Sequence, residues 1–502
     1  MGSPISVLRG ARAFARDFAR DQMPPGYLWD VVDYVPAIID AGLTGRGPWL
    51  WGSTAMGGDA ETGIYAPYST GDKLLIQATN GHLYDVGLGT PYTATDCGAI
   101  PRGRQNPVQL VDTVIALDGS SASAPKLITS PSGTPVIGAI ATGHKNAPLG
   151  CIYKSMLVTA AAPGELDTVR FSNTNATGLT DPASYDPNSY ARTSLQVTAI
   201  AALRSVILVF HAGSVERIRG ATPPRSPSSG GDMFLESLFD RAGCSDPLTI
   251  AYWNDNCIFA DSHGVHMTDG SIVRNLASQG GVLTYWRSLY ALKQSMCGTT
   301  YLDYYIVTVR GTDGSFNTLV CDLNRRQWFR FTNLDALCWI ASESGVSMER
   351  IWAGMYGTNR LARVGPCFFP TFTTSQIQDD DGTVVLPSFD TPWYRLAQEG
   401  RKRIRFGYLS YDVRASGVAP FDELVGLAVQ QILQMGYIRS PQQSTYTTLG
   451  TFPSTGGYTR YRLPLGQFPY GVAFRVQQLL PSTVTRVFDL AVEAQGAERS
   501  RV

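Results

Sequence analysis

Short apolar runs that lead into a glycine-containing turn recur seven times along the chain. Two examples are Leu74–Ile76, followed by Gly81, and Val206–Phe210, followed by Gly213. A continuous apolar run is typical of a buried strand, and glycine permits the positive φ of a tight hairpin turn. The turn glycines are Gly81, Gly119, Gly164, Gly213, Gly264, Gly314 and Gly357, at intervals of 38, 45, 49, 51, 50 and 43 residues.

After most of these turns a second strand is expected, because apolar and polar residues alternate, as in Val215–Ile218. Repeats of about 40–50 residues are typical of four-stranded propeller blades, whereas a regular solenoid keeps its repeat length more nearly constant. The pattern therefore predicts an all-β protein with a β-propeller of roughly seven blades, over residues 30–375.

The pattern changes near Asp379–Gly382, a predicted turn. Beyond it, longer strand-like runs such as 403–409 and 488–493 are separated by polar, turn-rich stretches. This predicts a C-terminal antiparallel β-sandwich over residues 376–502.

The N-terminal arm, residues 1–29, contains one stretch with helical spacing. Val7, Ala11, Phe14 and Phe18 fall on one face, which predicts a short helix over residues 5–21. We expect this helix either to dock on a neighbouring subunit or to cap its own domain. A strand expected at residues 27–35 precedes the first full blade and is the candidate for closing the ring against the last blade.

Composition narrows the function classes. Of 502 residues, 41 are basic and 41 acidic, and the charged fraction is 16%. A charged fraction below the usual quarter suggests that much surface is buried against neighbours. The absence of a basic excess argues against tight DNA binding. The sequence contains no run of about 20 apolar residues that would predict a membrane segment, and the N-terminus lacks a signal-peptide core. We therefore expect a protein that is made and kept in a reducing cytosol until it is assembled.

The side chains suited to chemistry form no convincing set. His263 and His266 would point to opposite faces of a strand, with no evident third metal ligand. Asp379–Gly382 resembles part of a calcium loop but lacks the closing glutamate. The eight cysteines contain no C-x-x-C pair and are expected to be free, mostly buried thiols. We therefore expect no enzyme activity, cofactor or metal.

The densest basic cluster in the sequence is a candidate for a binding contact rather than for chemistry. Arg401, Arg403 and Arg405 would share one face of a strand. They are candidates for subunit or phosphate contacts, with a solvated strand face as the other interpretation.

Three segments resemble the tail-nozzle proteins of short-tailed bacteriophages, also called tail-hub or packaged-DNA stabilisation proteins. They are Trp29–Pro36 with Arg46–Trp51, the stretch Ile200–Thr222, and Tyr461–Glu493. The resemblance implies a structural protein of the virion tail that is assembled in the host cytoplasm: a ring of six subunits below the head–tail adaptor ring, with a tail needle or tailspike beyond it. Duplex DNA would be retained by the nozzle and leave through its lumen without sequence-specific binding. The competing class is a tail-tip or receptor-binding propeller that binds glycans.

Overall fold

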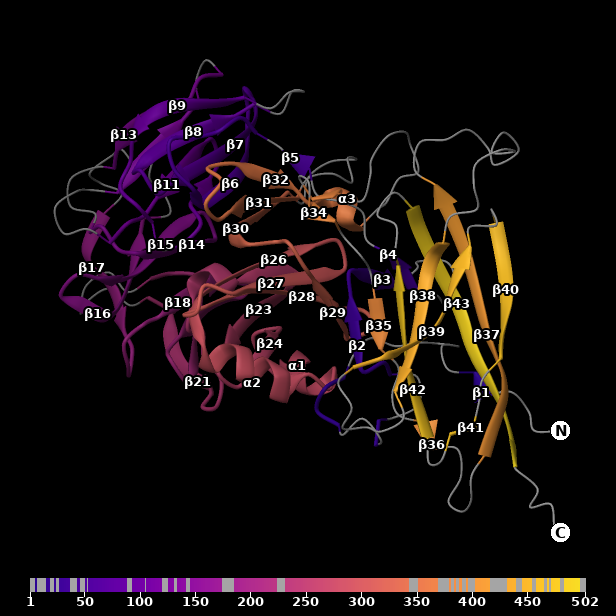
Figure 1. Cartoon of the computed structure of the whole chain (residues 1–502). Helices are drawn as coiled ribbons and strands as arrows, with labels where there is room; N and C mark the ends of the chain where they lie inside the picture. The colour runs from indigo at the N-terminus through magenta and orange to yellow at the C-terminus, as the bar shows by residue number, and fades with distance from the viewer. Residues whose placement is uncertain are drawn as a thin grey trace, which may run out of the picture.

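The computed structural model describes the propeller and the main strands of the C-terminal region (Figure 1). The described residues are 5–6, 15–18, 22–23, 27–36, 43–45, 50–51, 53–87, 93–103, 105–119, 125–130, 133–140, 145–173, 185–223, 231–342, 351–368, 379–380, 383–384, 388–390, 394–395, 402–415, 431–438, 445–453, 457–464, 467–468, 471–478 and 483–496.

The larger part of the molecule is a seven-bladed β-propeller, in which every blade is a four-stranded antiparallel unit. Blades 1 to 3 are β6 (Ala60–Tyr68), β7 (Gly71–Ala78), β8 (His82–Val86) and β9 (Ala94–Ala99); β10 (Val108–Leu110), β11 (Thr113–Ala116), β12 (Lys126–Thr129) and β13 (Val136–Ala139); and β14 (Leu149–Tyr153), β15 (Met156–Ala162), β16 (Glu165–Ser172) and β17 (Tyr185–Arg192).

Blades 4 to 7 complete the ring. They are β18 (Ala199–Ala202), β19 (Val206–Phe210), β20 (Val215–Arg219) and β21 (Phe234–Phe239); β22 (Ala251–Trp253), β23 (Asn256–Asp261), β24 (Gly264–Thr268) and β25 (Val273–Asn275); β26 (Lys293–Tyr301), β27 (Tyr304–Gly311), β28 (Phe316–Asp322) and β29 (Gln327–Phe331); and β30 (Ala336–Ala341), β31 (Ile351–Met355) and β32 (Leu361–Arg363) with β5 (Leu50–Trp51).

The seven apolar runs of the sequence form the second strand of each blade, which confirms the predicted propeller. These strands are buried on both faces because neighbouring blades pack against each side; every residue of β15, β19 and β31 is buried. The turns predicted at the glycines connect the second and third strands of the blades.

A strand from the N-terminal part closes the ring, but it is not the predicted one. Trp51 and Leu50 pair with Ala362 and Arg363, so β5 becomes the outer strand of blade 7. The prediction that the strand at 27–35 closes the ring is therefore wrong. That segment contains β2 (Asp30–Val32), which pairs in parallel with β29 of blade 6 and antiparallel with β35 of the C-terminal region.

Blades 7 and 1 meet through close apolar packing. Tyr65 of β6 stacks on Trp352 of β31, with ring centroids 5.9 Å apart and an interplanar angle of 11°. Beside them, Gly63 leaves no room for a side chain: a Cβ there would lie 2.5 Å from Ile340 Cδ1 and 2.9 Å from the carbonyl oxygen of Leu75. The glycine therefore allows blade 7 to approach the first strand of blade 1.

The C-terminal strands form two sheets, as expected for a sandwich. One sheet runs β3 (Tyr34–Pro36), β4 (Leu43–Gly45), β43 (Thr483–Gly496), β37 (Lys402–Ala415) and β40 (Gly457–Pro464), with β1 (Ile5–Ser6) on β43 and β41 (Gln467–Phe468) on β37. The other contains β35 (Ser388–Asp390), β42 (Gly471–Gln478), β38 (Gln431–Ile438) and β39 (Thr447–Pro453), with β36 (Tyr394–Arg395) on β42. A separate hairpin pairs β33 (Asp379–Asp380) with β34 (Thr383–Val384), at the predicted turn.

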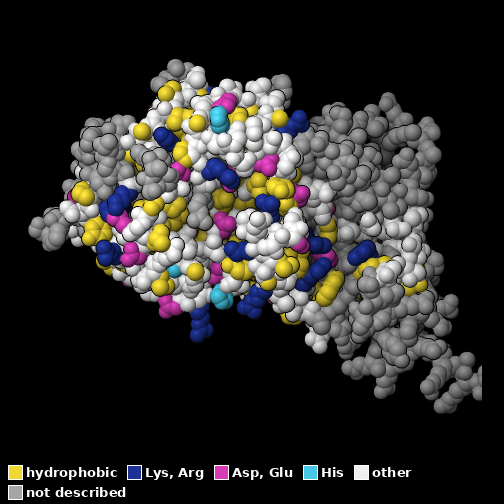
Figure 2. All heavy atoms as spheres, turned by 60° about the vertical axis from the view of Figure 1, so that its left-hand side comes forward, with side chains coloured by type: hydrophobic (Ala, Val, Ile, Leu, Met, Phe, Trp, Pro, Cys, Tyr) yellow, Lys and Arg dark blue, Asp and Glu magenta, His cyan; other side chains and the backbone are white. Residues whose placement is uncertain are grey.

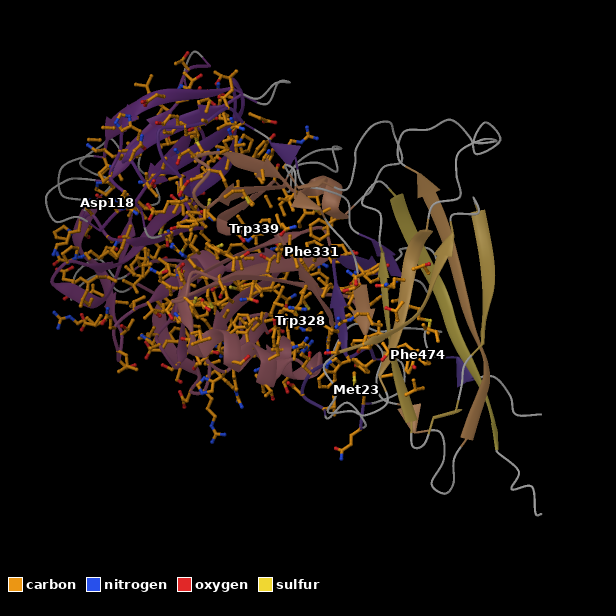
Figure 3. The ribbon with its side chains drawn as sticks, viewed as in Figure 1. Met23, Asp118, Trp328, Phe331, Trp339 and Phe474 are labelled. Atoms are coloured by element: carbon orange, nitrogen blue, oxygen red, sulfur yellow. The ribbon has the colours of Figure 1, made fainter. Side chains whose placement is uncertain are left out.

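Propeller and C-terminal region share a continuous ten-stranded sheet, because β2 lies between β29 and β35. One hydrophobic cluster spans the junction and includes Val31, Trp328 and Phe474, all fully buried. Figure 3 shows Trp328 and Phe331 on the propeller side and Phe474 on the C-terminal side. Although the sequence places residues 30–45 in the propeller, strands β3 and β4 belong to a sheet of the C-terminal region, and β2 belongs to the shared sheet.

Of the helix predicted over residues 5–21, residues 7–14 and 19–21 lie outside the described residues, and the described residues 5–6 and 15–18 contradict it. Ile5–Ser6 pairs with β43, and Ala15–Phe18 is not helical. The backbone of this segment bonds elsewhere: Ala15 N donates to the carbonyl of Leu28, and Asp17 N donates to the carbonyl of Gly281, both at 3.0 Å. At Ala15 and Asp17, tertiary hydrogen bonds thus take the place of the helical ladder that the spacing predicts.

The described helices are short. They are the 3₁₀ turn η2 (Pro247–Thr249), α1 (Leu276–Gln279), α2 (Leu283–Ala291) and α3 (Gly365–Phe368). Asp17 caps α2, because its carboxylate accepts hydrogen bonds from the backbone N–H groups of Leu283 and Thr284 at 2.8 and 2.6 Å. Within the described part of the chain, no helix has the length and apolar character needed to cross a bilayer.

Candidate functional site

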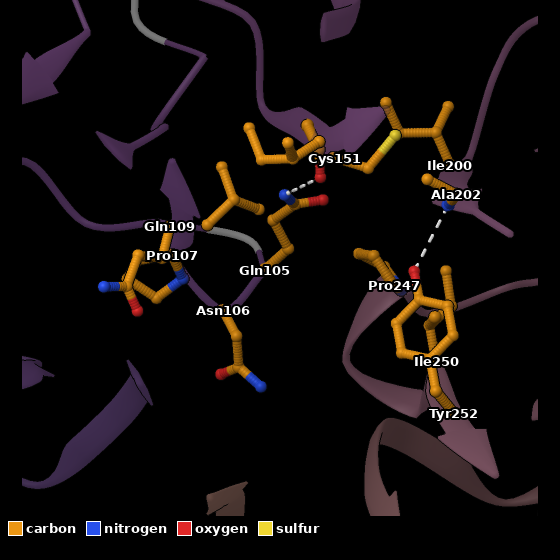
Figure 4. Close-up of a pocket in the computed structure, with 13 residues that line it drawn as sticks. Gln105, Asn106, Pro107, Gln109, Cys151, Ile200, Ala202, Pro247, Ile250 and Tyr252 are labelled. Atoms are coloured by element: carbon orange, nitrogen blue, oxygen red, sulfur yellow. Dashed lines mark hydrogen bonds between the residues drawn. The ribbon is translucent and has the colours of Figure 1, made fainter. Parts of the chain in front are cut away.

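The central channel of the propeller contains a cavity of about 430 Å³, lined by the first strands of blades 2 to 5 and the segments that lead into them (Figure 4). Gln105, Asn106, Cys151, Ile200 and Tyr252 are among its lining residues, and none of its lining side chains is charged. A volume of this size suits a small molecule rather than a macromolecule.

The polar residues of this cavity connect neighbouring blades. Gln105 Nε2 donates to the carbonyl of Gly150 at 2.7 Å, and Asn106 Oδ1 accepts from Gly63 N at 3.2 Å. On the far wall, the Tyr252 hydroxyl accepts from Ala202 N at 3.2 Å (Figure 4). The first strands expose unpaired backbone groups towards the channel, and these side chains satisfy them.

The channel cavity contains no activated nucleophile. Cys151 is its one thiol, and burial raises the pKa of Cys151 to about 12. At neutral pH the group is therefore a protonated thiol, whereas cysteine chemistry requires the thiolate.

A second cavity of about 480 Å³ lies where the first strands begin, and it shares Pro247 with the first. It does contain charged residues: Glu61, Asp246 and Lys293. Asp246 is engaged structurally, because it accepts from Leu248 N at 3.3 Å and from Met296 N at 3.0 Å. Glu61 binds Arg102 through two hydrogen bonds of 2.7 and 2.5 Å.

Near this cavity, Glu165 forms a small ionic cluster. Arg170 Nε lies 2.7 Å from Glu165 Oε2, and Lys145 contacts the other carboxylate oxygen. Hydrogen bonds from Arg170 first, and then from Lys145, lower the pKa of Glu165 from 4.5 to about 2, against the opposing effect of burial.

Blades 4 and 5 carry two buried acid–histidine pairs in reciprocal order. His211 follows β19 and lies 3.1 Å, Nε2 to Oε2, from Glu216 in β20. Asp261 ends β23, and its Oδ1 lies 2.8 Å from His266 Nε2 in β24. The acid and the histidine exchange places between hairpins of the same geometry.

The hydrogen bonds of His211 determine how many protons its pair carries. Nδ1 lies 2.8 Å from the carbonyl of Gln196, which can only accept, so Nδ1 bears a hydrogen. The facing Nε2 and Glu216 Oε2 then need one further proton between them, since two acceptors would repel. Gln196, whose carbonyl accepts the hydrogen bond from His211, also lines the second cavity.

Asp261 connects the two blades at this junction. Besides His266, it accepts hydrogen bonds from Gly243 N at 2.9 Å and His263 N at 2.7 Å. Burial alone would raise the pKa of Asp261, but His266 and these backbone donors hold it below its usual range. The carboxylate therefore stays charged at neutral pH and fixes the loop that enters blade 5.

The structure places the candidate metal ligands as follows. Asp261 lies between His263 and His266, but no group of three or more metal-binding side chains in the described residues is arranged to hold an ion. All eight cysteines are free and seven are buried, which confirms that prediction.

Of the predicted arginine cluster, Arg403 and Arg405 lie on β37, away from the propeller channel. Arg401 is outside the described residues, and the backbone of Arg403 pairs with Gln467 and Gln495. The register between β37 and β43 shifts between Ile404 and Phe406, so regular pairing is interrupted at Arg405. Subunit or phosphate contacts of these arginines stay a prediction.

The junction of blade 6 with β2 contains an ion-pair cluster that the sequence did not indicate. Asp30 Oδ1 accepts from Arg330 Nε at 3.0 Å and Oδ2 accepts from Arg330 Nη2 at 2.7 Å, while Arg16 contacts Oδ2 as well. Asp33 accepts from Thr332 N at 2.8 Å. The contacts of Asp30 with Arg330 and of Asp33 with Thr332 connect residues some 300 positions apart, which sequence spacing does not reveal.

Charges are interspersed on one face of the propeller. Figure 2 shows basic and acidic side chains mixed over one face of the propeller, without a continuous basic patch there. This distribution agrees with the balanced composition and offers no phosphate-binding track on that face.

No family model and no curated protein sequence matches the chain. Among solved structures, it is similar to the computationally designed Ika8 protein, with 11% identity, coverage of 64% of this chain and 100% of that chain, and a TM-score of 0.37. The fold assignment rests on the seven sheets themselves.

Proposed function

We propose that this chain is a structural tail protein of a short-tailed bacteriophage and forms the nozzle ring below the head–tail adaptor. The observation that carries the proposal is where the resembling segments lie. Trp29–Pro36 contains β2, which joins blade 6 to the C-terminal sheet, and Arg46–Trp51 contains β5, which closes the propeller. Tyr461–Glu493 supplies β42, the partner of β35 in the shared sheet.

A shared sheet of this kind suits a mechanical part. Relative motion of two units is resisted when a large apolar core and backbone hydrogen bonds cross between them. Here one hydrophobic cluster and a ten-stranded sheet cross the junction. A subunit that retains DNA under load and then releases it needs such rigidity.

DNA would pass between subunits rather than through a propeller. The cavity within the propeller channel is about 430 Å³, and side chains of four blades line it. The lumen would therefore belong to the ring, in which each subunit meets the next through two different surfaces. Charge balance at the lumen would limit phosphate binding, which otherwise retards movement of the duplex.

Electron microscopy of the virion tests this proposal. The expected result is six copies around an axial channel, with the adaptor ring above and a needle or tailspike beyond. Three copies at a tail tip, or a single copy carrying bound glycan, would reject the nozzle and leave the propeller fold unaffected.

One observation favours the second candidate, a glycan-binding propeller. The channel cavity is uncharged, and it combines amide groups with the ring of Tyr252, which is 39% exposed. Neutral hydroxyl-rich ligands bind through such groups. Glycan-array binding that is lost in Tyr252→Ala, with the fold retained, would support this candidate; no binding to any glycan would remove it.

A further inference from the structure

Arg310 is a cation whose partners are aromatic rings. It lies at the end of β27, directly opposite Phe316 in the strand pairing. Its guanidinium carbon is 4.3 Å from the ring centroid of Tyr356 and 5.6 Å from that of Phe316. The two rings are themselves 5.5 Å apart. We call Arg310, Phe316 and Tyr356 the arginine clamp.

The arginine clamp holds a guanidinium without a protein acceptor. Nε of Arg310 is buried and has no hydrogen-bond partner, and no described residue forms an ion pair or hydrogen bond with this side chain. Other arginines at blade junctions differ: Arg217 and Arg219 share Glu236, and Arg330 binds Asp30. A charge held this way, with unused donors, is suited to an external anion.

The clamp is accessible at the surface. Tyr356 follows β31 directly, in the turn between the second and third strands of blade 7, and is 46% exposed. Contact with aromatic rings covers guanidinium faces and orients the planar donors, which is the preorganisation that bidentate recognition of an anion uses.

The local charges distinguish between anions. Asp313 lies in the β27–β28 turn beside the clamp and is held by Ser315, whose N and Oγ donate to it at 3.0 and 2.7 Å. These hydrogen bonds lower the pKa of Asp313, so it is negative at neutral pH. One guanidinium next to a fixed negative charge matches a monovalent carboxylate better than a phosphate dianion.

We propose that the arginine clamp is a docking site for an acidic peptide segment of a protein partner, whose Asp or Glu carboxylate binds Arg310 in a bidentate manner. This inference goes beyond the nozzle assignment and does not depend on it, since the clamp lies within one subunit at the junction of blades 6 and 7.

The test uses the full chain and a peptide blocked at both ends that contains two glutamates, with saturation-transfer NMR as the binding assay. Arg310→Gln should weaken binding about tenfold or more, and Arg310→Lys nearly as much, because lysine lacks the planar fork. Tyr356→Leu should weaken binding too. The control is Arg325→Gln, an exposed arginine 3.9 Å from Asp322 whose loss should leave binding unchanged.

Three results would overturn the proposal: equal binding by wild type and Arg310→Gln, full binding by Arg310→Lys, or tighter binding of inorganic phosphate than of acetate at matched ionic strength. Thermal melting of each variant verifies that it is folded. An unaltered peptide signal in Arg310→Gln would leave the nozzle proposal standing, whereas loss of ring assembly with normal peptide binding would affect only the nozzle.

Discussion

The substitution Asp30→Asn should release strand β2 from blade 6. Asp30 is 8% exposed and binds both nitrogens of the Arg330 fork, together with Arg16. Backbone pairing of β2 with β29 consists of one register position, Val32 with Arg330, so the side-chain cluster carries much of the attachment. Asparagine keeps the shape but removes the charge, and leaves Arg330 partly buried without an anion.

The magnitude follows from the burial of the pair. Removing one member of a buried ion pair costs about 3–5 kcal/mol. The Arg330 side chain is 25% exposed, so water can partly replace the lost partner. We therefore expect a cost of about 2–4 kcal/mol, which corresponds to about 30- to 900-fold more frequent opening of this junction.

Hydrogen exchange measured by mass spectrometry checks this prediction. Peptides covering β2 and β29 should exchange faster in Asp30→Asn, while peptides from blades 1 to 4 should not change. The control is Asp96→Asn, since Asp96 pairs with His82 at a site where its side chain is 46% exposed. Unchanged exchange at β2, or an equal increase throughout the propeller, would refute the reasoning.

Three further predictions concern the blades. Gly63→Ala should destabilise the fold by about 1–3 kcal/mol through overpacking, whereas Gly213→Ala, where a Cβ would meet nothing within 4 Å, should be tolerated. The melting temperature should therefore fall in Gly63→Ala and stay near that of the wild type in Gly213→Ala; equal melting temperatures of the two variants would contradict this. The difference in free energy of unfolding between wild type and Glu165→Gln should be largest above about pH 4.5 and should decrease as the pH falls towards 2. The reason is that the pKa of Glu165 is lowered in the folded state, so this side chain stabilises the fold only while its carboxylate is ionised. A difference that increases in acid would contradict this. His211→Leu should cost about 3 kcal/mol because Glu216 loses its buried partner, but Glu216→Gln less than about 1 kcal/mol, since its amide can donate to neutral His211; equal losses in thermal melts would show otherwise.

The propeller could be predicted because its signal is local and repeated. Each second strand is buried between two blades, so a run such as Val206–Phe210 must be apolar throughout, and the turn that follows must permit a hairpin. Ring closure lacked such a signal. Both Asp30–Val32 and Leu50–Trp51 have strand composition, so composition does not show which of them closes the ring. Asp30–Val32 is held elsewhere by the contact between Asp30 and Arg330, and a contact between residues so far apart in the sequence is visible only in the folded structure.

The helix predicted in the N-terminal arm is contradicted at its described residues because its signal occurs only once along the chain. The spacing of Val7, Ala11, Phe14 and Phe18 does match a helix, but short isolated helices are marginal and follow their tertiary contacts. Here the backbone of Ala15 and Asp17 bonds to Leu28 and Gly281 instead. Helical periodicity in a short terminal segment is therefore weaker information than the same signal repeated in seven blades.

The acid–histidine pairs could have been predicted from the sequence in part. His211 and Glu216 are five residues apart, as are Asp261 and His266, and both sets flank a blade turn. Aligning the repeats would have revealed the reciprocal order, although not the burial that gives it meaning.

Three pairs of buried or half-buried groups at the junctions follow one rule, and Arg310 does not follow it. Asp30 with Arg330, His211 with Glu216, and Asp261 with His266 each place opposite or proton-sharing groups together. Backbone edges at the channel are satisfied in the same way by neutral amides such as Gln105. A ring in which each blade supplies hydrogen-bond partners to the polar groups of its neighbour needs few charged side chains, which agrees with the charged fraction of 16%. Arg310 departs from this rule: its charge is held by rings and by no anion of the described chain, so its partner should come from outside.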